Sequence, residues 1–120
     1  MARIVHFEIP ADDPEKLIEF YKNAFGWTFT RWGEEPYWLA MTGDPSQPGI
    51  NGGILKKRAP DMPVVNTIGV DDIDAAIAAV EQNGGIIVVP KTTMPKMGYL
   101  CYFRDPEGTI TGMMQEDTNA

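Results

Sequence analysis

Residues 11–27 read ADDPEKLIEFYKNAFGW, and this stretch carries the signals of a complete amphipathic helix. An aspartate is suited to capping the amino end, and Pro14 fits the first helical position, where a missing N–H costs little. The apolar residues recur at helical spacing, at Leu17, Phe20, Tyr21 and Ala24. Gly26 follows as a typical C-terminal stop. The stretch therefore predicts one helix of the fold.

The same pattern returns 59 residues later, in residues 70–86 (VDDIDAAIAAVEQNGGI). At this shift Asp12 and Asp13 fall on Asp71 and Asp72, and Gly26 falls on Gly85. The shift also holds without gaps for two strand-like segments. GINGGILK (49–56) lands on GTITGMMQ (108–115), and RIVHFEI (3–9) lands on MPVVNTI (62–68). Two matched helices and two matched strands at one offset indicate a duplicated module.

Each half is predicted to contain a strand, the helix and then three more strands. The expected strands are at about 3–9, 27–32, 36–41 and 50–57, and then at about 63–70, 86–90, 98–103 and 109–115. Turn residues such as the run DPEG (105–108) separate them. We therefore expect an α+β fold with a single domain over residues 1–120, built from modules at about 1–57 and 63–116.

The composition restricts the functions that are open to the chain. Its net charge of −7 argues against a nucleic-acid surface, and the short basic run Lys56-Lys57-Arg58 is interpreted as a solvated strand end. No apolar run is long enough to span a bilayer, and the N-terminus lacks the layout of a secretory signal. A single cysteine, Cys101, excludes an internal disulfide and a cysteine-based zinc cluster, so a reducing cytoplasm is the expected location.

A duplicated βαβββ module of this size resembles the vicinal oxygen chelate superfamily. That group holds glyoxalase (lactoylglutathione lyase), bleomycin-resistance proteins, fosfomycin-resistance enzymes and extradiol dioxygenases. The most specific matches are HFEIPADDPEKLIEFYKNAFGW (6–27) and GYLCYFRDPEGTITGMMQED (98–117), which look like small bacterial glyoxalase-like proteins, many of unknown function. The resemblance spans essentially the whole chain. It implies eight strands in a curved sheet with a central cleft and with helices outside.

The resemblance also implies a metal site with four inward-pointing ligands, usually His and Glu. Carried over by position, the four places are His6, Gly53, Val65 and Gly112. Three of them have no ligating side chain, whereas a transition metal wants three or four protein ligands. We therefore expect no bound metal and predict no cofactor. A substitute set from Glu8 and Asn51 stays open, although no spacing motif supports it.

Strand alternation predicts which side chains face the cleft. The set is largely apolar, aromatic or small: His6, Glu8, Asn51, Gly53, Leu55, Val65, Thr67, Gly69, Tyr99, Cys101, Phe103, Gly112 and Met114. In one interpretation the glycines widen a small-molecule pocket. In the other these residues form a closed core, with Tyr99, Phe103 and Met114 as the side chains that fill it.

His6 is the only histidine in the chain, and its role has two interpretations. His6 and Glu8 could form a catalytic acid–base pair. Alternatively His6 is a satisfied histidine inherited from a metal-binding ancestor, which we favour because no nucleophile or third orienting group is visible. Cys101 is interpreted as a small buried apolar residue. An aromatic group in the first half, Trp27, Trp32, Tyr37 and Trp38, is assigned to packing, with a stacking wall for a planar ligand as the alternative.

Three functions remain open after these considerations. The chain is a metal-independent protein that binds a small apolar or aromatic molecule, or a lyase or isomerase that acts near a carbonyl, or an accessory subunit with a vestigial cleft. The enzyme would need an atypical metal site or His6 as its base. The missing ligands disfavour the standard metal-dependent enzyme. A symmetric homodimer is expected, because exposed module edges and a Trp- and Met-rich surface suit contact between two copies. Neither a nucleic acid nor a membrane is expected as a partner.

Overall fold

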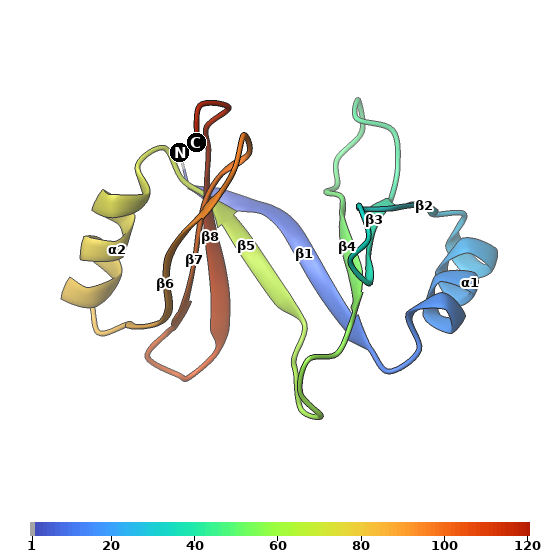
Figure 1. Cartoon of the computed structure of the whole chain (residues 1–120), viewed down its shortest axis with the longest axis horizontal. Coiled ribbons are helices and arrows are strands. Elements are labelled where there is room, and N and C mark those ends of the chain that lie inside the picture. Colours follow the sequence, from blue (N-terminus) through green and yellow to red (C-terminus); the bar gives the residue numbers. More distant parts are fainter. Residues whose placement is uncertain (1) are drawn as a thin grey trace. The chain divides into compact units, whose positions relative to one another are not determined.

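The computed structural model describes residues 2–120, which form eight strands and two helices in the order β1-α1-β2-β3-β4-β5-α2-β6-β7-β8 (Figure 1). These residues separate into two compact units. Residues 6–64 form what we call the first unit. Residues 2–5 and 65–120 form the second unit. Neither of the two helices has the length and apolar character needed to cross a membrane.

A small mixed sheet forms the first unit. Its strands are β1 (Arg3–Ala11), whose first residues belong to the second unit, β2 (Thr28–Arg31), β3 (Tyr37–Met41) and β4 (Gly52–Lys56). β2 pairs antiparallel with β3, β3 pairs antiparallel with β4, and β4 pairs parallel with β1.

The second unit repeats this arrangement. Its strands are β5 (Val65–Gly69), β6 (Ile86–Met94), β7 (Gly98–Arg104) and β8 (Ile110–Glu116). β5 pairs parallel with β8, which pairs antiparallel with β7, which pairs antiparallel with β6. Glu8 is opposite Gly53 in the first unit, and Thr67 is opposite Gly112 in the second. These pairs are related by the 59-residue shift, so the duplicated module and the α+β class are confirmed.

Helix α1 (Pro14–Phe25) has the boundaries that the sequence predicts. The Asp13 side chain accepts a hydrogen bond from the Lys16 amide at 3.2 Å, which satisfies a free N–H of the first turn. Gly26 ends the helix with a left-handed φ of 75°, and its N–H donates to the Lys22 carbonyl. Tyr21 on this helix stacks on Trp27 with ring centroids 4.6 Å apart. Aromatic side chains therefore hold α1 against its sheet.

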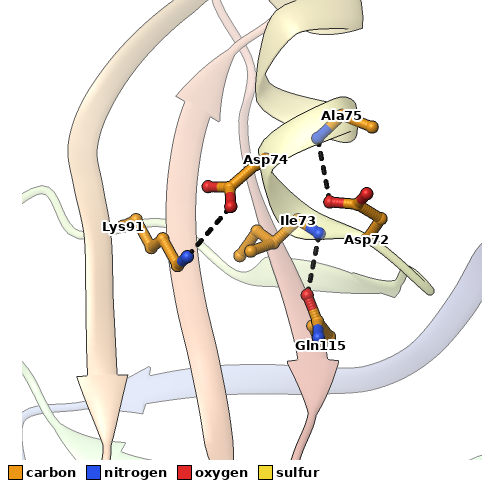
Figure 2. Close-up of polar contacts among 6 residues, drawn as sticks. All are labelled: Asp72, Ile73, Asp74, Ala75, Lys91 and Gln115. Atoms are coloured by element: carbon orange, nitrogen blue, oxygen red, sulfur yellow. Dashed lines mark hydrogen bonds and ion pairs between the residues drawn. The ribbon is translucent and has the colours of Figure 1, made fainter.

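Helix α2 (Ile73–Gln82) is fixed through its first turn, as Figure 2 shows. Asp72 caps the helix by accepting from the Ala75 amide, and the Ile73 amide donates to the Gln115 side-chain oxygen on β8 at 2.9 Å. Lys91 on β6 forms an ion pair with Asp74 at 3.1 Å. The core beneath this helix contains the buried side chains of Ile73, Cys101 and Met113.

Strand β6 is longer than the sequence predicts, because it runs to Met94 and not to residue 90. Its pairing with β7 shifts register between Ile87 and Val89 and again between Val89 and Thr92. Pro90 lies within the second shift and has no N–H to donate to the ladder. The proline interrupts the pairing without ending the strand, whereas the pattern alone predicted a stop.

Candidate functional site

The first unit's sheet has two chemically different faces. An added Cβ at Gly52 would lie 2.6 Å from the Phe7 ring, whereas at Gly53 it would lie 2.2 Å from the Tyr37 hydroxyl. The Phe7 side carries Trp27 and packs with α1 through its aromatic rings. His6 and Glu8 alternate with Phe7 and so point to the other side. We call the side with His6, Glu8, Tyr37, Gly53 and Leu55 the His6 face.

A short hydrogen bond joins His6 and Tyr37 on this face. The His6 Nε2 atom lies 2.7 Å from the Tyr37 hydroxyl, and the two rings are within 7° of parallel. Burial lowers the pKa of His6 below its ordinary value, and the negative charge of Glu8 opposes this shift in part. The imidazole is therefore neutral near pH 7. A phenol hydroxyl both donates and accepts, so it suits the neutral imidazole.

Tyr37 occupies the space that Gly53 leaves on the His6 face. The Cβ of any larger residue at Gly53 would lie 2.2 Å from the Tyr37 hydroxyl oxygen and 2.4 Å from Cζ. From the sequence, the filling side chains were expected to be Tyr99, Phe103 and Met114, whereas Tyr37 was expected to serve in packing or, alternatively, in a stacking wall for a ligand. The missed signal is the strand order, because β3 lies next to β4 and so brings Tyr37 beside Gly53.

In the second unit, three of the expected cleft residues lie on the other face. Tyr99, Cys101 and Phe103 pack with the core beneath α2. β7 pairs Tyr102 with Gly112 and Cys101 with Met113, so Tyr102 shares the face of Gly112. The sequence predicted that Tyr99, Cys101 and Phe103 share a face with Gly112, but the alternate residue Tyr102 does so. An error of one residue in the alternation places every side chain of a strand on the opposite face.

The Gly112 position is also closely surrounded. An added Cβ would lie 2.9 Å from Thr67 Oγ1 and 3.1 Å from Tyr102 Cε1. Thr67 is buried, as is Val65 on the same strand. Met114 is half-buried and lies opposite Leu100 on β7. Within this unit the small residues are covered by neighbouring side chains.

Asn51 precedes β4, and its side chain closes the loop that leads to this strand. Its side-chain oxygen accepts from the Thr42 amide at 2.9 Å, while the Thr42 hydroxyl donates to the Ile50 carbonyl at 2.6 Å. These bonds hold the two ends of the loop 42–51 together. Asn51 is therefore engaged in a loop and is poorly suited to the substitute metal set.

The residues present do not fit a divalent transition-metal site. Of the positions carried over from the family resemblance, only His6 has a ligating side chain, and its Nε2 is hydrogen-bonded to Tyr37. Across residues 2–120, no group of three or more His, Cys, Asp or Glu side chains is placed to hold a metal. A single neutral imidazole beside a phenol lacks the three or four donors that such an ion needs.

A hollow of about 510 Å³ adjoins this pair. It is lined by Trp32, Glu35, Pro36, Tyr37, Leu55, Lys56, Lys57 and Arg58. Trp32 meets Tyr37 edge to face, with ring centroids 6.0 Å apart. A second hollow of about 690 Å³ has Trp27 and Trp38 in its wall, together with residues of α1. The aromatic group of the first half is thus divided between two surfaces.

Comparison with known proteins identifies relatives over nearly the whole chain. The model of the Glyoxalase/Bleomycin resistance protein/Dioxygenase superfamily matches residues 3–111. A probable lactoylglutathione lyase of Vibrio cholerae is 29% identical over 94% of this chain and 90% of its own. A glyoxylase-like domain-containing protein of Didymella fabae is 30% identical over 88% of each chain. A solved superfamily member from Vibrio splendidus has the same fold, with a TM-score of 0.70 and 14% identity over 97% and 100% of the chains.

Proposed function

The chain belongs to the glyoxalase/bleomycin resistance protein/dioxygenase superfamily, and on that premise we propose that it binds a small apolar or aromatic molecule without a metal, on the His6 face. The observation that carries the proposal is the Tyr37 hydroxyl, which fills the space over Gly53 and bonds to His6 at 2.7 Å. A neutral histidine–tyrosine pair thus stands where the family resemblance implies two metal ligands.

The surroundings of this pair suit a flat apolar ligand. The adjoining hollow has a volume within the range of small-molecule sites, about 300–1,000 Å³. It is lined by both Trp32, which is 42% exposed, and Leu55, which is 2% exposed. An exposed indole beside a tyrosine ring offers a stacking surface, and the His6–Tyr37 pair supplies a polar group that would orient the ligand.

A binding measurement with a neutral aromatic probe tests this function. Calorimetry with 2-naphthylmethanol should give saturable binding that is unchanged by EDTA. Trp32→Ala should weaken the binding roughly fivefold, since a ring contact contributes about 1 kcal/mol. Phe20→Ala is the matched control, because Phe20 is an exposed aromatic residue on α1, outside the hollow, and should have no effect. Absence of saturable binding, or binding that requires added metal, would refute the proposal.

A second candidate is a lyase or isomerase that acts near a carbonyl. The observation in its favour is the His6–Tyr37 pair at 2.7 Å, in which burial lowers the pKa of His6 and so leaves the imidazole unprotonated near pH 7 and able to accept a proton. With the His6 Nε2–H donating to the Tyr37 oxygen, the Tyr37 hydroxyl could donate a hydrogen bond to the carbonyl oxygen where negative charge develops, and His6 Nδ1 would be the base. The lactoylglutathione lyase relative supports this class of substrate.

Proton exchange would distinguish this enzyme from a binding protein. Incubation with S-lactoylglutathione in D₂O, followed by NMR, reports exchange of the proton beside the carbonyl. The enzyme predicts exchange that is abolished in His6→Gln and reduced in Tyr37→Phe. Exchange no faster than in buffer alone would refute the enzyme and favour the metal-independent binding function.

A further inference from the structure

We infer that the ligand of the His6 face is a planar aromatic carboxylate, with its ring against Trp32 and Tyr37 and its carboxylate held by Lys57 and Arg58. The inference rests on the function proposed above, because it concerns the hollow beside the His6–Tyr37 pair. It adds the charge of the ligand, which that proposal leaves open.

The charged side chains that line the hollow are mostly positive, although the chain as a whole is negative. The protein has a formal net charge of −7, yet three cations and one carboxylate line this hollow. The cations are Lys56, Lys57 and Arg58, a run that the sequence alone suggested to be a solvated strand end. A concentration of positive charge at the wall of an aromatic hollow favours an anionic ligand.

The backbone of the basic run is held in place from two sides. The Lys56 amide donates to the Pro36 carbonyl at 3.0 Å, and the Lys57 amide donates to the Ala11 carbonyl at 2.9 Å. The first bond fixes the run to the residue before β3, and the second fixes it to the end of β1. The backbone at Lys56 and Lys57 is therefore already ordered, which lowers the entropic cost of holding a ligand there.

The existing ion pair of this run is weak enough for a ligand to replace. Lys57 Nζ lies 3.5 Å from a carboxylate oxygen of Asp12, whose side chain is 85% exposed. Pairs that are this open to water contribute little to stability. The Lys57 side chain is only 28% exposed and lines the hollow, so a ligand carboxylate bound there would be more shielded from water than the Asp12 carboxylate is.

Arg58 supplies geometry that lysine lacks. Its planar guanidinium can donate two parallel N–H bonds to one carboxylate. The aromatic wall of Trp32 and Tyr37 is adjacent in the same hollow, whose volume of about 510 Å³ admits one or two fused rings. A flat ring with a carboxylate at its edge matches both parts of the site.

Two probes that differ only in charge test the inference. Calorimetry at low ionic strength should show 2-naphthoate binding at least about tenfold more tightly than neutral 2-naphthylmethanol, a difference of about 1.4 kcal/mol, because only the carboxylate can accept charge-assisted hydrogen bonds from Lys57 and Arg58. Arg58→Gln and Lys57→Gln together should reduce this preference to about twofold or less. Lys22→Gln is the matched control, because Lys22 lines the other hollow, and it should leave the preference unchanged. Salt should diminish the preference in the wild type.

Each outcome separates the inference from the function on which it rests. Equal binding of the two probes would overturn the carboxylate assignment and leave the proposed binding function standing. A preference for 2-naphthoate that survives both substitutions would also overturn it, since the carboxylate would then be held elsewhere. Absence of binding by either probe would refute the proposed function itself. Tryptophan fluorescence establishes that each variant is folded, because all three tryptophans lie at positions 27–38.

Discussion

The Gly53→Ala substitution would test directly whether Tyr37 fills the His6 face. The new methyl carbon would lie 2.2 Å from the Tyr37 hydroxyl and 2.4 Å from Cζ, whereas ordinary contacts begin at about 3.4 Å. The phenol ring must therefore turn away from its present position. Turning it breaks the 2.7 Å hydrogen bond to His6.

The expected cost follows from three contributions. Overpacking costs about 1–3 kcal/mol, and the lost hydrogen bond costs about 1 kcal/mol. Replacing a strand glycine with alanine returns about 0.5–1 kcal/mol by reducing the entropy of the unfolded chain. The net loss in the free energy of unfolding should be about 2 kcal/mol. With Tyr37→Ala already present, the obstacle is gone and Gly53→Ala should be neutral or slightly stabilising.

Urea unfolding followed by tryptophan fluorescence measures this effect, since all three tryptophans lie in the first unit. Gly43→Ala is the matched control, because nothing lies within 4 Å of its added Cβ, and it should change stability by less than about 0.5 kcal/mol. The double-mutant coupling between positions 37 and 53 should be about 2 kcal/mol. A Gly53→Ala cost that equals that of Gly43→Ala, or that persists unchanged in Tyr37→Ala, would refute the packing described for this face.

Three further predictions concern other positions. The folded-state pKa of His6 lies below its ordinary value of 6.5, so its contribution to stability should be fully present above pH 6.5. As the pH falls through the folded-state pKa, the wild type should lose stability relative to His6→Gln. Urea unfolding of both proteins at pH 7.5 and 5.5 measures this loss, and parallel pH profiles would contradict it. Burial raises the pKa of the Cys101 thiol, so Ellman's reagent should modify the native protein only slowly. In urea the reagent should modify one thiol per chain at once. Rapid modification of the native protein would show that the core beneath α2 is open. Gly112→Leu should lower the free energy of unfolding by about 1–3 kcal/mol through overpacking against Thr67 and Tyr102, and unchanged stability would indicate free space at that position.

The sequence was a reliable guide wherever the signals were local or repeated. The boundaries of α1 follow from Asp13 and Gly26, which act on the helix ends beside them. The 59-residue shift anticipated that Glu8 and Thr67 would have equivalent partners, because a duplicated module keeps its strand register. The Glyoxalase superfamily resemblance rested on the same features and is confirmed.

The misplaced residues depend on information that no short segment contains. Cys101 was assigned to the wrong face, because the face of a residue on β7 depends on its register with β8, and one residue of slip reverses it. Tyr37 was missed as the filling residue, because His6 and Tyr37 are 31 residues apart and meet only through the pairing of β1, β4 and β3. A glycine in the sequence indicates that space is left beside the strand, but it does not identify the side chain that fills this space.

The metal content of the protein tests most directly whether the His6–Tyr37 pair has replaced a metal site. The measurement is elemental analysis of protein purified without a histidine tag and equilibrated with zinc, nickel, iron and manganese in turn. Because His6 is a single donor already bonded to Tyr37, we expect far less than one ion per chain, and the same value for His6→Ala. About one ion per chain, lost in His6→Ala, would contradict the proposed metal-independent site.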